Sequence, residues 1–345
     1  MIEIKNLSRS FGATKAVDDI SFAVDSGEIV GFLGPNGAGK TTTLRMMVGY
    51  LQPEAGMIEL DGESVFSDPL AASARIGYLP EHNPLYEEMN VREFLVYMGE
   101  LRRLPKPVLN ERLEFVRAKC GLEPVWLRPV KTLSKGFKQR AGLAQAILHD
   151  PDVLLLDEPT GGLDPNQIIE IRQLIRELGQ AKTVILSSHI MQEVQALCSR
   201  VIIINAGRII VDDRIENLGS YINGFNRLIL EVEAEEPDFR PWLDQFEEVE
   251  LDSYVQSGSQ AALQFLTPPD VDMRKDLSAF VLSQGWELVS IYQEKQSLEN
   301  IFHELTSTPE QAPHEEHPNG TDEQEGGEDE EPPDEVRKQE TEEEK

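Results

Sequence analysis

Residues 28–42 read EIVGFLGPNGAGKTT and decide the fold. The apolar run at 28–33 is typical of a buried strand, residues 34–41 match the pattern G-x-x-x-x-G-K-[ST], and a helical run follows. In this strand–loop–helix context, glycines allow a tight turn whose N–H groups point inward and can hold phosphate oxygens. The dipole of the following helix favours the same negative charge. The stretch therefore predicts a phosphate-binding loop in an α/β domain.

The residues of this loop have separate expected roles. Lys40 can reach the β- and γ-phosphates of a nucleotide, and the Thr41 hydroxyl can bind Mg²⁺. A chance glycine-rich turn is the alternative, and the strand before the loop and the helix after it argue against that alternative. The expected nucleotide-binding residues are Gly34, Pro35, Asn36, Gly37, Ala38, Gly39, Lys40, Thr41 and Thr42.

A pair of carboxylates follows another apolar run. Residues 153–158 read VLLLDE, so Asp157 and Glu158 come at the carboxyl end of a buried strand, the edge at which open α/β sheets bind ligands. Asp157 can hold Mg²⁺ directly or through water, and Glu158 can accept a proton from an attacking water. Taken alone, the pair would be a solvated strand end. The phosphate-binding loop upstream favours the catalytic interpretation.

The remaining motifs, in their order along residues 1–217, resemble those of the ABC family of ATPases. They are the start of a Q-loop at 76–81 (IGYLPE), the signature sequence at 133–140 (LSKGFKQR), the D-loop at 161–165 (GGLDP) and the switch histidine within 187–194 (SSHIMQEV). The resemblance implies an enzyme that hydrolyses ATP with Mg²⁺. It also implies a dimer in which two ATP molecules lie between the phosphate loop of one subunit and the signature of the other.

The resemblance assigns roles to two further residues of the chain's own site. Phe11, in SFGATKAV, matches the aromatic residue that stacks on adenine, and His189 matches the histidine that contacts the γ-phosphate and the attacking water. From the residues alone, an aromatic ring at position 11 would more often belong to a core. An isolated histidine would more often be structural.

Other residues would serve the nucleotide of the opposite subunit. Ser134, Lys135 and Gly136 begin a predicted helix, where a hydroxyl and N–H groups can meet a γ-phosphate. By the resemblance, that phosphate is held by the partner. Asp164 would bridge the seam between the subunits near the catalytic carboxylate. Its alternative role is to cap the helix that begins at Pro165.

Two positions depart from the family pattern. Glu81 stands where the Q-loop glutamine is usual, and its carboxylate can still hold Mg²⁺ or a water bound to it. Residues 135–137 read KGF in place of two glycines and a glutamine, and Lys135 adds a cation where negative charge must be neutralised. With the final LENIFHELT at 298–306, these departures resemble the ATPases of ABC-2-type exporters. Residues 76–95 further resemble the bacterial gliding-motility-associated branch.

The apolar pattern divides the chain into three parts. Residues 1–217 alternate strand-like and helical runs, which predicts an ABC nucleotide-binding domain with a mainly parallel sheet covered on both faces and a helical subdomain over about 84–149. Residues 218–306 predict a small α+β accessory domain. Residues 307–345 contain 16 acidic and 3 basic residues and almost no apolar ones, which predicts a disordered acidic tail.

Charge and hydropathy indicate which partners and which location to expect for the protein. A net charge of -30 argues against a nucleic-acid partner. No run approaches the roughly 18 apolar residues of a spanning helix, and the first ten residues do not read as a signal peptide. We therefore expect a cytoplasmic protein bound to the inner face of the membrane through a permease. Cys120 and Cys198 form no CxxC pair and are expected to be buried thiols.

These observations predict the ATP-hydrolysing subunit of an ABC transporter. It would act as a homodimer or heterodimer and power integral membrane permease subunits, receiving their coupling helix at about 83–103. One alternative is an ABC ATPase of ribosomes or DNA, which usually has paired cassettes or a coiled-coil insertion and basic surfaces. A regulatory binder without hydrolysis is a second alternative, disfavoured because Lys40, Asp157, Glu158 and His189 are all present. A GTPase would need an N-K-x-D motif, which the sequence lacks.

Overall fold

A six-stranded sheet lies at the centre of the first part of the chain in the computed structural model, which describes residues 1–221, 226–268, 271–294 and 298–307. Its order is β10-β9-β3-β8-β7-β6, and every neighbouring pair is parallel except β10 with β9. The strands are β3 (Ile29–Leu33), β6 (Ile76–Leu79), β7 (Val153–Asp157), β8 (Thr183–Ser188), β9 (Arg200–Asn205) and β10 (Arg208–Arg214). The parallel strands are almost wholly buried, as expected for a sheet covered on both faces. The predicted α/β fold class is confirmed.

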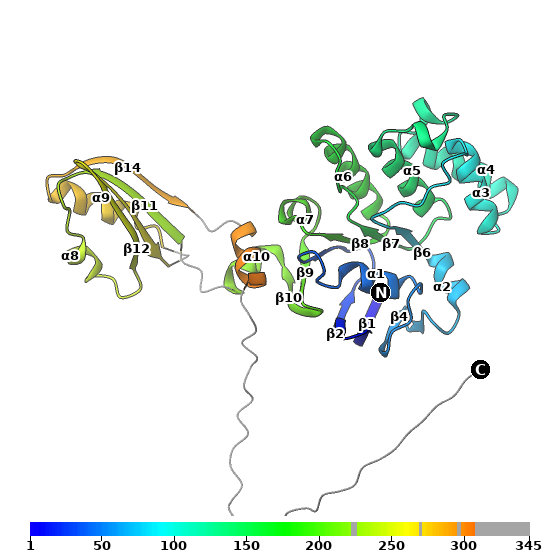
Figure 1. The fold of residues 1–345 in the computed structure, drawn as a ribbon, viewed down its shortest axis with the longest axis horizontal. Coiled ribbons are helices and arrows are strands. Elements are labelled where there is room, and N and C mark those ends of the chain that lie inside the picture. Colours follow the sequence, from blue (N-terminus) through cyan, green and yellow to red (C-terminus); the bar gives the residue numbers. More distant parts are fainter. Residues whose placement is uncertain (222–225, 269–270, 295–297, 308–345) are drawn as a thin grey trace, which may run out of the picture. The chain divides into compact units, whose positions relative to one another are not determined.

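A second sheet, antiparallel and in the order β2-β1-β4-β5, covers one face of the central sheet (Figure 1). Its strands are β1 (Ile2–Phe11), β2 (Thr14–Val24), β4 (Ala55–Leu60) and β5 (Glu63–Ser64). The sequence predicts the first strand but not this sheet. The physical reason is that the pairing of β1 shifts register at several points, which interrupts the alternation that identifies a half-buried strand.

Most of the helices cover the other face of the central sheet, and the first two lie on the side of the antiparallel sheet. Between β6 and β7, where the sequence predicts a helical subdomain, the chain forms helices and two 3-10 turns. The helices of this part of the chain are α1 (Lys40–Met47), α2 (Pro69–Arg75), α3 (Val91–Leu101), α4 (Lys106–Lys119), α5 (Lys135–Ile147), α6 (Pro165–Gly179) and α7 (Met191–Leu197). Among the described residues, no helix is long and apolar enough to cross a membrane.

The central sheet separates two hydrophobic cores. Successive residues of β7 point to opposite faces, so Leu154 and Leu156 pack among α3–α7, whereas Val153 and Leu155 pack against α1 and the antiparallel sheet. Cys120 is buried in the helical core, and Cys198 is also buried there. Both thiols are free, as predicted. The two cores fix the carboxyl ends of β3, β7 and β8, from which the candidate site residues emerge.

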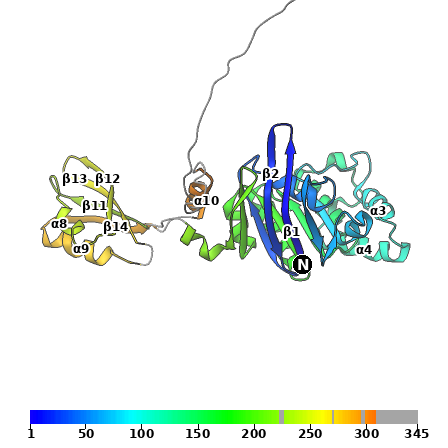
Figure 2. The same cartoon turned by 90° about the horizontal axis from the view of Figure 1, so that it is seen from below.

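The small α+β region has the order βαββαβ. Its sheet runs β12-β13-β11-β14 and is antiparallel throughout. The elements are β11 (Asn226–Glu233), α8 (Arg240–Leu243), β12 (Glu250–Ser257), β13 (Gln260–Thr267), α9 (Arg274–Ser283) and β14 (Glu287–Glu294). Both helices lie on one face of the sheet (Figure 2), where Trp242 and Leu277 contribute to a separate core.

The last helix, α10 (Leu298–Ser307), packs away from that core. Ile301 is buried in the helical core of the first part, beside α7 and the 3-10 turn η3 (Ile215–Tyr221). Asn205 at the end of β9 donates a hydrogen bond to the carbonyl of Thr306 at 3.0 Å. By its position along the chain, α10 was expected to belong to the accessory domain, but its apolar side packs on the first part of the chain. The predicted disordered tail lies outside the described residues, apart from Ser307.

Candidate active site

The loop at 34–39 joins β3 to α1 and requires glycine at Gly34, where a Cβ would lie 2.3 Å from the carbonyl oxygen of Ile204, and at Gly39. Gly39 has φ +110°, and a Cβ on it would lie 2.4 Å from the carbonyl oxygen of Ala16. Gly37 also has a positive φ, of +82°, but its Cβ would meet nothing within 4 Å. The Gly34 N–H donates to the carbonyl of Ser188 at 3.2 Å, which ties the loop to the end of β8. The loop is thus fixed at both sides of its turn.

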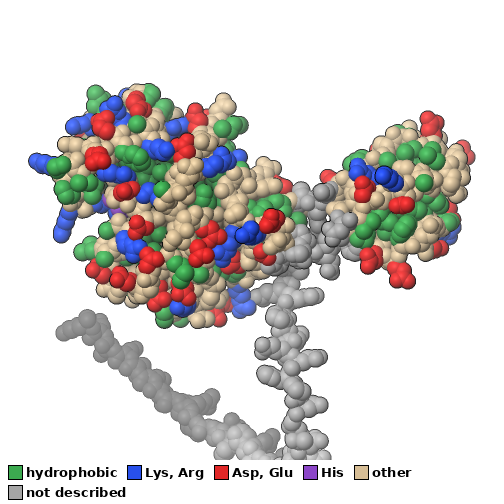
Figure 3. All heavy atoms as spheres, turned by 180° about the vertical axis from the view of Figure 1, so that it is seen from behind, with side chains coloured by type: hydrophobic (Ala, Val, Ile, Leu, Met, Phe, Trp, Pro, Cys, Tyr) green, Lys and Arg blue, Asp and Glu red, His purple; other side chains and the backbone are tan. Residues whose placement is uncertain are grey.

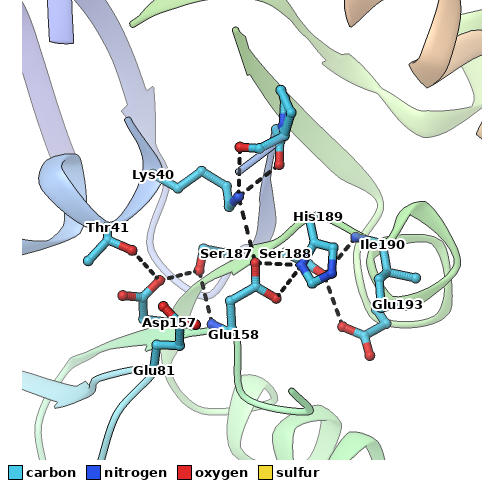
Figure 4. A network of polar contacts seen from close by, with 12 residues as sticks. Lys40, Thr41, Glu81, Asp157, Glu158, Ser187, Ser188, His189, Ile190 and Glu193 are labelled. Carbon is cyan, nitrogen blue, oxygen red and sulfur yellow. Dashed lines mark hydrogen bonds and ion pairs between the residues drawn. The ribbon is translucent and has the colours of Figure 1, made fainter. Parts of the chain in front are cut away.

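Lys40, the first residue of α1, is buried with its ammonium at the mouth of this loop. Its Nζ donates to the carbonyl oxygens of Gly34 at 2.7 Å and Pro35 at 3.2 Å, and it lies 3.6 Å from Oε1 of Glu158 (Figure 4). Burial lowers the pKa of Lys40, and the nearby carboxylates of Glu158 and Asp157 oppose that effect. The ammonium is therefore held by groups that a phosphate oxygen can replace or join.

Asp157 ends β7 with a fully buried carboxylate. Its Oδ1 accepts hydrogen bonds from Ser187 Oγ at 2.6 Å and Thr41 Oγ1 at 3.2 Å. Its Oδ2 is buried and has no hydrogen-bond partner. A buried carboxylate oxygen without a donor is costly, so this atom indicates a missing positive group. A hydroxyl and a carboxylate are hard oxygen ligands of the kind Mg²⁺ prefers, and the residues present therefore fit this ion.

No cluster of three or more His, Cys, Asp or Glu side chains in the described part of the chain could hold a metal ion by itself. This agrees with the chemistry of Mg²⁺, which is commonly bound by one or two protein oxygens together with waters and substrate phosphates. The metal residues predicted from the sequence were Thr41, Asp157 and Glu81. The structure brings Thr41 and Asp157 into direct contact, and it places Glu81 in the wall of the same cavity.

Glu158 has a left-handed backbone with φ +47°, a conformation that residues with a side chain rarely adopt. Its N–H donates to Ser187 Oγ at 3.0 Å, and its carboxylate oxygens lie 2.9 and 3.0 Å from Nδ1 of His189. Burial raises the pKa of Glu158, while His189 and Lys40 act in the opposite direction. A buried carboxylate with a raised pKa, held in a strained backbone, is typical of a catalytic base.

Several polar residues of the site were not predicted from the sequence: His82, Asn83, Lys138 and Gln139 in the cavity lining, and Ser187, Ser188 and Glu193 behind it. Ser187 bridges Asp157 and the backbone of Glu158, and Ser188 donates to Glu193 at 2.9 Å while accepting from the Ile190 N–H at 3.0 Å. The available signal was the pair of serines before His189 in SSHIMQEV. Their role depends on the pairing of Asp157 with Ser187 across β7 and β8. Strand register is a long-range property that the sequence pattern does not contain.

A single cavity of about 750 Å³ unites most of the predicted residues. This volume lies within the range of small-molecule binding sites. Of the predicted site residues, those that line it are Asn36, Gly37, Gly39, Lys40, Thr41, Thr42, Glu81, Lys135, Glu158 and His189. Gly34, Pro35 and Ala38 shape the loop from behind, and Asp157 lies beneath the cavity, bonded to Thr41. The loop, the two strand ends and the start of α5 thus face one space.

Four other predicted residues also lie outside the cavity lining. Phe11, at the end of β1, is 51% exposed, and the guanidinium of Arg9 lies 5.3 Å from its ring centroid. Ser134 is the N-cap of α5, and Gly136 is buried, where a Cβ would meet the side chain of Gln167. The remaining one, Asp164, caps α6 by accepting from the Gln167 N–H at 3.0 Å. Capping, the alternative considered for Asp164, is thus present in the single chain.

The Q-loop region is tied to α5. Asn83 Nδ2 donates to the carbonyl of Lys138 at 3.0 Å, and its side chain lies against Gly142. Glu81 is about half exposed and lies beside Asp157 in the wall of the same cavity (Figure 4). The Nζ of Lys135 lies against Gly162 of the D-loop, where it would clash with any added Cβ. The start of α5 therefore contacts both flanking loops.

A phosphate-binding loop, a hydroxyl–carboxylate pair suited to Mg²⁺ and a buried glutamate held by a histidine form the arrangement of a P-loop nucleotide hydrolase. Comparisons with known proteins agree with this class. A family model described as ABC transporter matches residues 17–161. The uncharacterized ABC transporter ATP-binding protein YxlF of Bacillus subtilis is 34% identical over 302 residues, covering 88% of this chain and 98% of the relative.

Two other similarities cover a smaller share of the chain. The bacitracin transport ATP-binding protein BcrA of Bacillus licheniformis is 39% identical over 221 residues, covering 63% of this chain and 71% of the relative. The solved structure of cbiO1 from Clostridium perfringens, part of the ABC transporter complex cbiONQ, matches with a TM-score of 0.58 and 27% identity, covering 64% of this chain and 90% of that chain. The chain belongs to the family of ABC transporter ATP-binding proteins. It is an ATPase whose hydrolysis is coupled to transport.

Proposed function

We propose that this chain drives an export-type ABC transporter by hydrolysing ATP with Mg²⁺ between two copies of its ATP-binding domain. The observation that carries the proposal is the cluster of Lys40, Glu158 and His189 on one cavity, with Glu158 Oε1 3.6 Å from the lysine and 2.9 Å from the histidine. This cluster brings phosphate charge neutralisation and proton abstraction within reach of one bound nucleotide.

The chain's own residues would divide the chemistry as follows. The loop N–H groups and Lys40 bind the phosphates, and the dipole of α1 adds to their attraction. Glu158 takes the proton of the attacking water, and its buried position makes the carboxylate more basic than a solvated one. His189 orients that carboxylate: an ionised Glu158 only accepts, so Nδ1 carries the proton of their hydrogen bond. Mg²⁺ bound by Thr41 and Asp157, with Glu81 acting directly or through water, would supply charge neutralisation at the phosphates.

A dimer is proposed because part of the signature sequence lies away from the chain's own cavity. Ser134 is exposed and Gly136 is buried, and both lie outside the cavity lining, whereas the exposed Lys135 reaches it. We propose that Ser134, Lys135 and Gly136 contact the γ-phosphate bound by the other subunit, that Asp164 lies at the seam, and that Phe11 stacks on adenine. Closing of this dimer on ATP and opening after hydrolysis would move the permease.

The location and partners proposed for the chain follow from its family and from its net charge. We propose that integral membrane permease subunits recruit the chain to the inner face of the membrane, with residues 1–217 as the ATP-binding domain, about 84–149 as its helical subdomain and 218–306 as an accessory region. Similarity to a Nod factor export ATP-binding protein supports export, and residues 76–95 favour the gliding-motility-associated branch. On the face seen in Figure 3, Lys and Arg side chains are interspersed with Asp and Glu, which does not favour a nucleic-acid partner.

The test uses two lesions that should complement each other. Glu158→Gln should retain ATP binding, lower turnover by about two to four orders of magnitude and accumulate an ATP-bound dimer. Lys40→Ala should lose ATP binding, whereas Ser134→Arg should bind ATP without hydrolysing it. A covalently linked dimer carrying Lys40→Ala in one half and Ser134→Arg in the other keeps one composite site and should retain activity. Wild-type turnover of Glu158→Gln would refute the catalytic assignment. A linked dimer as inactive as a control that carries both lesions in the same half would refute a shared site that hydrolyses ATP independently of the second site.

A further inference from the structure

The small α+β region has a groove beside β12, at one edge of its sheet. The helix α9 packs against β14 at the opposite edge, so β12 is covered only by α8, which has four residues (Figure 2). Leu251 and Tyr254 of β12 stand opposite buried core residues of β13 in the register and therefore lie on the core side of the sheet. Both are nevertheless 42% exposed. The space beside them has a volume of about 540 Å³.

The floor of this groove is apolar and adjoins an open strand edge. Phe239 and Leu243 line the groove from the side of α8, and Leu263 lines it from β13. The volume lies within the range of ligand-binding clefts. Among the described residues no strand pairs with the outer side of β12, so its backbone N–H and C=O groups on that side can accept an added strand. One strand thus presents both an apolar groove and an edge for backbone hydrogen bonds.

The chain around the groove is strongly acidic. Residues 231–252 contain ten acidic residues and one basic residue, Arg240. That guanidinium is already paired, because its Nε and one terminal nitrogen each donate to the carboxylate of Asp238 at 2.8 Å. Glu250 and Asp252 of β12 are exposed, and neither forms an ion pair with any of the described residues. Carboxylates without a counter-ion therefore lie beside the groove.

We propose that β12 and its groove bind an extended segment from the cytoplasmic side of the permease subunit, in which apolar residues alternate with Lys or Arg. The segment adds to the sheet along β12, with its apolar side chains in the groove and its cations on the opposite face, where Glu250 lies. Cytoplasmic segments of integral membrane proteins carry an excess of Lys and Arg, which complements the carboxylates of this edge. The proposal rests on the proposed function in that its partner is the permease subunit.

The charge of the groove disfavours the chain's own segments as the occupant. A second copy brings the same acidic excess, and residues 307–345 contain 16 acidic and 3 basic residues. Like charges across an interface oppose binding. A permease segment needs only modest affinity, because the ATP-binding domain already holds the partner nearby. At an effective concentration of about 1 mM, a Kd of about 0.1 mM fills the groove to about nine-tenths.

The first measurement is the binding of fluorescein-labelled peptides to the full chain, followed by fluorescence anisotropy. The probe is a peptide of eight residues, the length of β12, in which Val alternates with Lys. One control peptide alternates Val with Glu, and a second places the same Val and Lys residues in two separate blocks. The alternating Val/Lys peptide should bind at least about tenfold more tightly than either control, because it alone matches both the charge and the two-residue period of a strand.

Charge reversal on β12 tests where the peptide binds. Glu250→Lys combined with Asp252→Lys should weaken binding of the Val/Lys peptide by about tenfold and should strengthen binding of the Val/Glu peptide. The matched control combines Asp276→Lys and Glu287→Lys, which reverse two exposed carboxylates on α9 and β14. This control has the same net charge and should bind the Val/Lys peptide within about threefold of wild type, since distant charges are screened. Circular dichroism checks that both variants are folded.

The second measurement identifies the occupant in membranes of the native host. The photo-cross-linking residue p-benzoylphenylalanine replaces Tyr254 in the groove, and in the matched control it replaces Tyr292, a similarly exposed tyrosine on the other edge strand, β14. Position 254 should link to an integral membrane subunit, and mass spectrometry should place the link in a cytoplasmic segment that bears Lys or Arg. Position 292 should give no such product.

The outcomes separate this proposal from the proposed function. Equal binding of the three peptides, or binding that the reversal of Glu250 and Asp252 leaves unchanged, would overturn the groove as a site for a basic strand. A link from position 254 to a second copy, to residues 307–345, to a soluble protein or to nothing beyond the control would overturn the permease segment as the occupant. Either failure leaves the proposed function standing if Glu158→Gln still forms a dimer with ATP and Mg²⁺. Selective peptide binding by a chain that forms no such dimer would support the groove and contradict the proposed function.

Discussion

Replacing Ser187 by alanine is the most informative single change in the site. The Ser187 hydroxyl donates to Asp157 at 2.6 Å and accepts the Glu158 N–H at 3.0 Å, in a fully buried position. A hydrogen bond to a charged group contributes about 1.5–3 kcal/mol, and the Glu158 N–H left without a partner adds about 1 kcal/mol. We expect Ser187→Ala to lower the free energy of unfolding by about 3 kcal/mol.

The same change should weaken Mg²⁺ use. Asp157 would keep only its contact with Thr41, at 3.2 Å, so its carboxylate would no longer be fixed in one orientation. An orientation loss of about 1.4 kcal/mol corresponds to a tenfold higher Mg²⁺ concentration at half-maximal ATPase rate. The measurements are urea unfolding followed by circular dichroism, and a Mg²⁺ titration of ATPase activity at saturating ATP.

Ser188→Ala is the matched control. The Ser188 hydroxyl is equally buried and also makes two hydrogen bonds, to Glu193 at 2.9 Å and from the Ile190 N–H at 3.0 Å, on the other side of β8. It should cost a similar amount of stability, about 2–3 kcal/mol, without changing the Mg²⁺ requirement. The role of Ser187 in holding Asp157 for Mg²⁺ is refuted if Ser187→Ala keeps the wild-type Mg²⁺ requirement, or if Ser188→Ala raises that requirement equally.

Three further predictions concern the base, the loop and the Q-loop carboxylate. Burial raises the pKa of Glu158 above 4.5, and the base acts in its ionised form, so kcat/KM should fall with decreasing pH at a midpoint above pH 4.5. A pH–rate profile with a midpoint at or below pH 4.5 would contradict Glu158 as the base. Gly39→Ala should lower the free energy of unfolding by more than about 2 kcal/mol and abolish ATP binding, because its Cβ would lie 2.4 Å from the Ala16 carbonyl oxygen. Gly37→Ala has open space around it and should lower the free energy of unfolding by only about 1 kcal/mol, for its positive φ. Chemical denaturation and nucleotide titration compare the two variants, and equal losses would rule out the steric explanation. Glu81→Gln should keep basal ATP hydrolysis within a few-fold but need more Mg²⁺ for half-maximal rate, since a neutral amide holds the cation or its water less strongly, and superimposable Mg²⁺ titrations would show that Glu81 does not serve the metal.

The parts of the site that the sequence predicts are those set by short-range pattern. A strand, a glycine-rich turn and a helix are contiguous in residues 28–51, so the positions of Lys40 and Thr41 follow from the local chain. The same holds for Glu158, which follows a buried strand directly. The sequence alone could therefore predict that Lys40, Thr41, Glu158 and His189 lie at one site, and all four line the cavity.

The sequence could not predict contacts that depend on which strands are neighbours in the sheet. The sequence does not state that β7 pairs with β8 in the register that brings Ser187 to Asp157, nor that β1 pairs with β4. Ser134 and Asp164 illustrate the reverse case. Their capping roles are local and were considered or readily derived, while any function toward a second subunit depends on a surface outside the chain.

The return of α10 to the first part of the chain makes the region between η3 and α10 an insertion rather than a terminal appendage. Shortening the chain after residue 221 would remove Ile301 and Phe302 and uncover apolar side chains of η3 and α7. A minimal ATP-binding unit for crystallography or display should therefore fuse residues 1–221 to 298–307 through a short Gly/Ser linker and omit residues 226–294. By the same topology, the excised region can be exchanged for a foreign domain whose termini lie close together, with both ends of the graft anchored on one hydrophobic core.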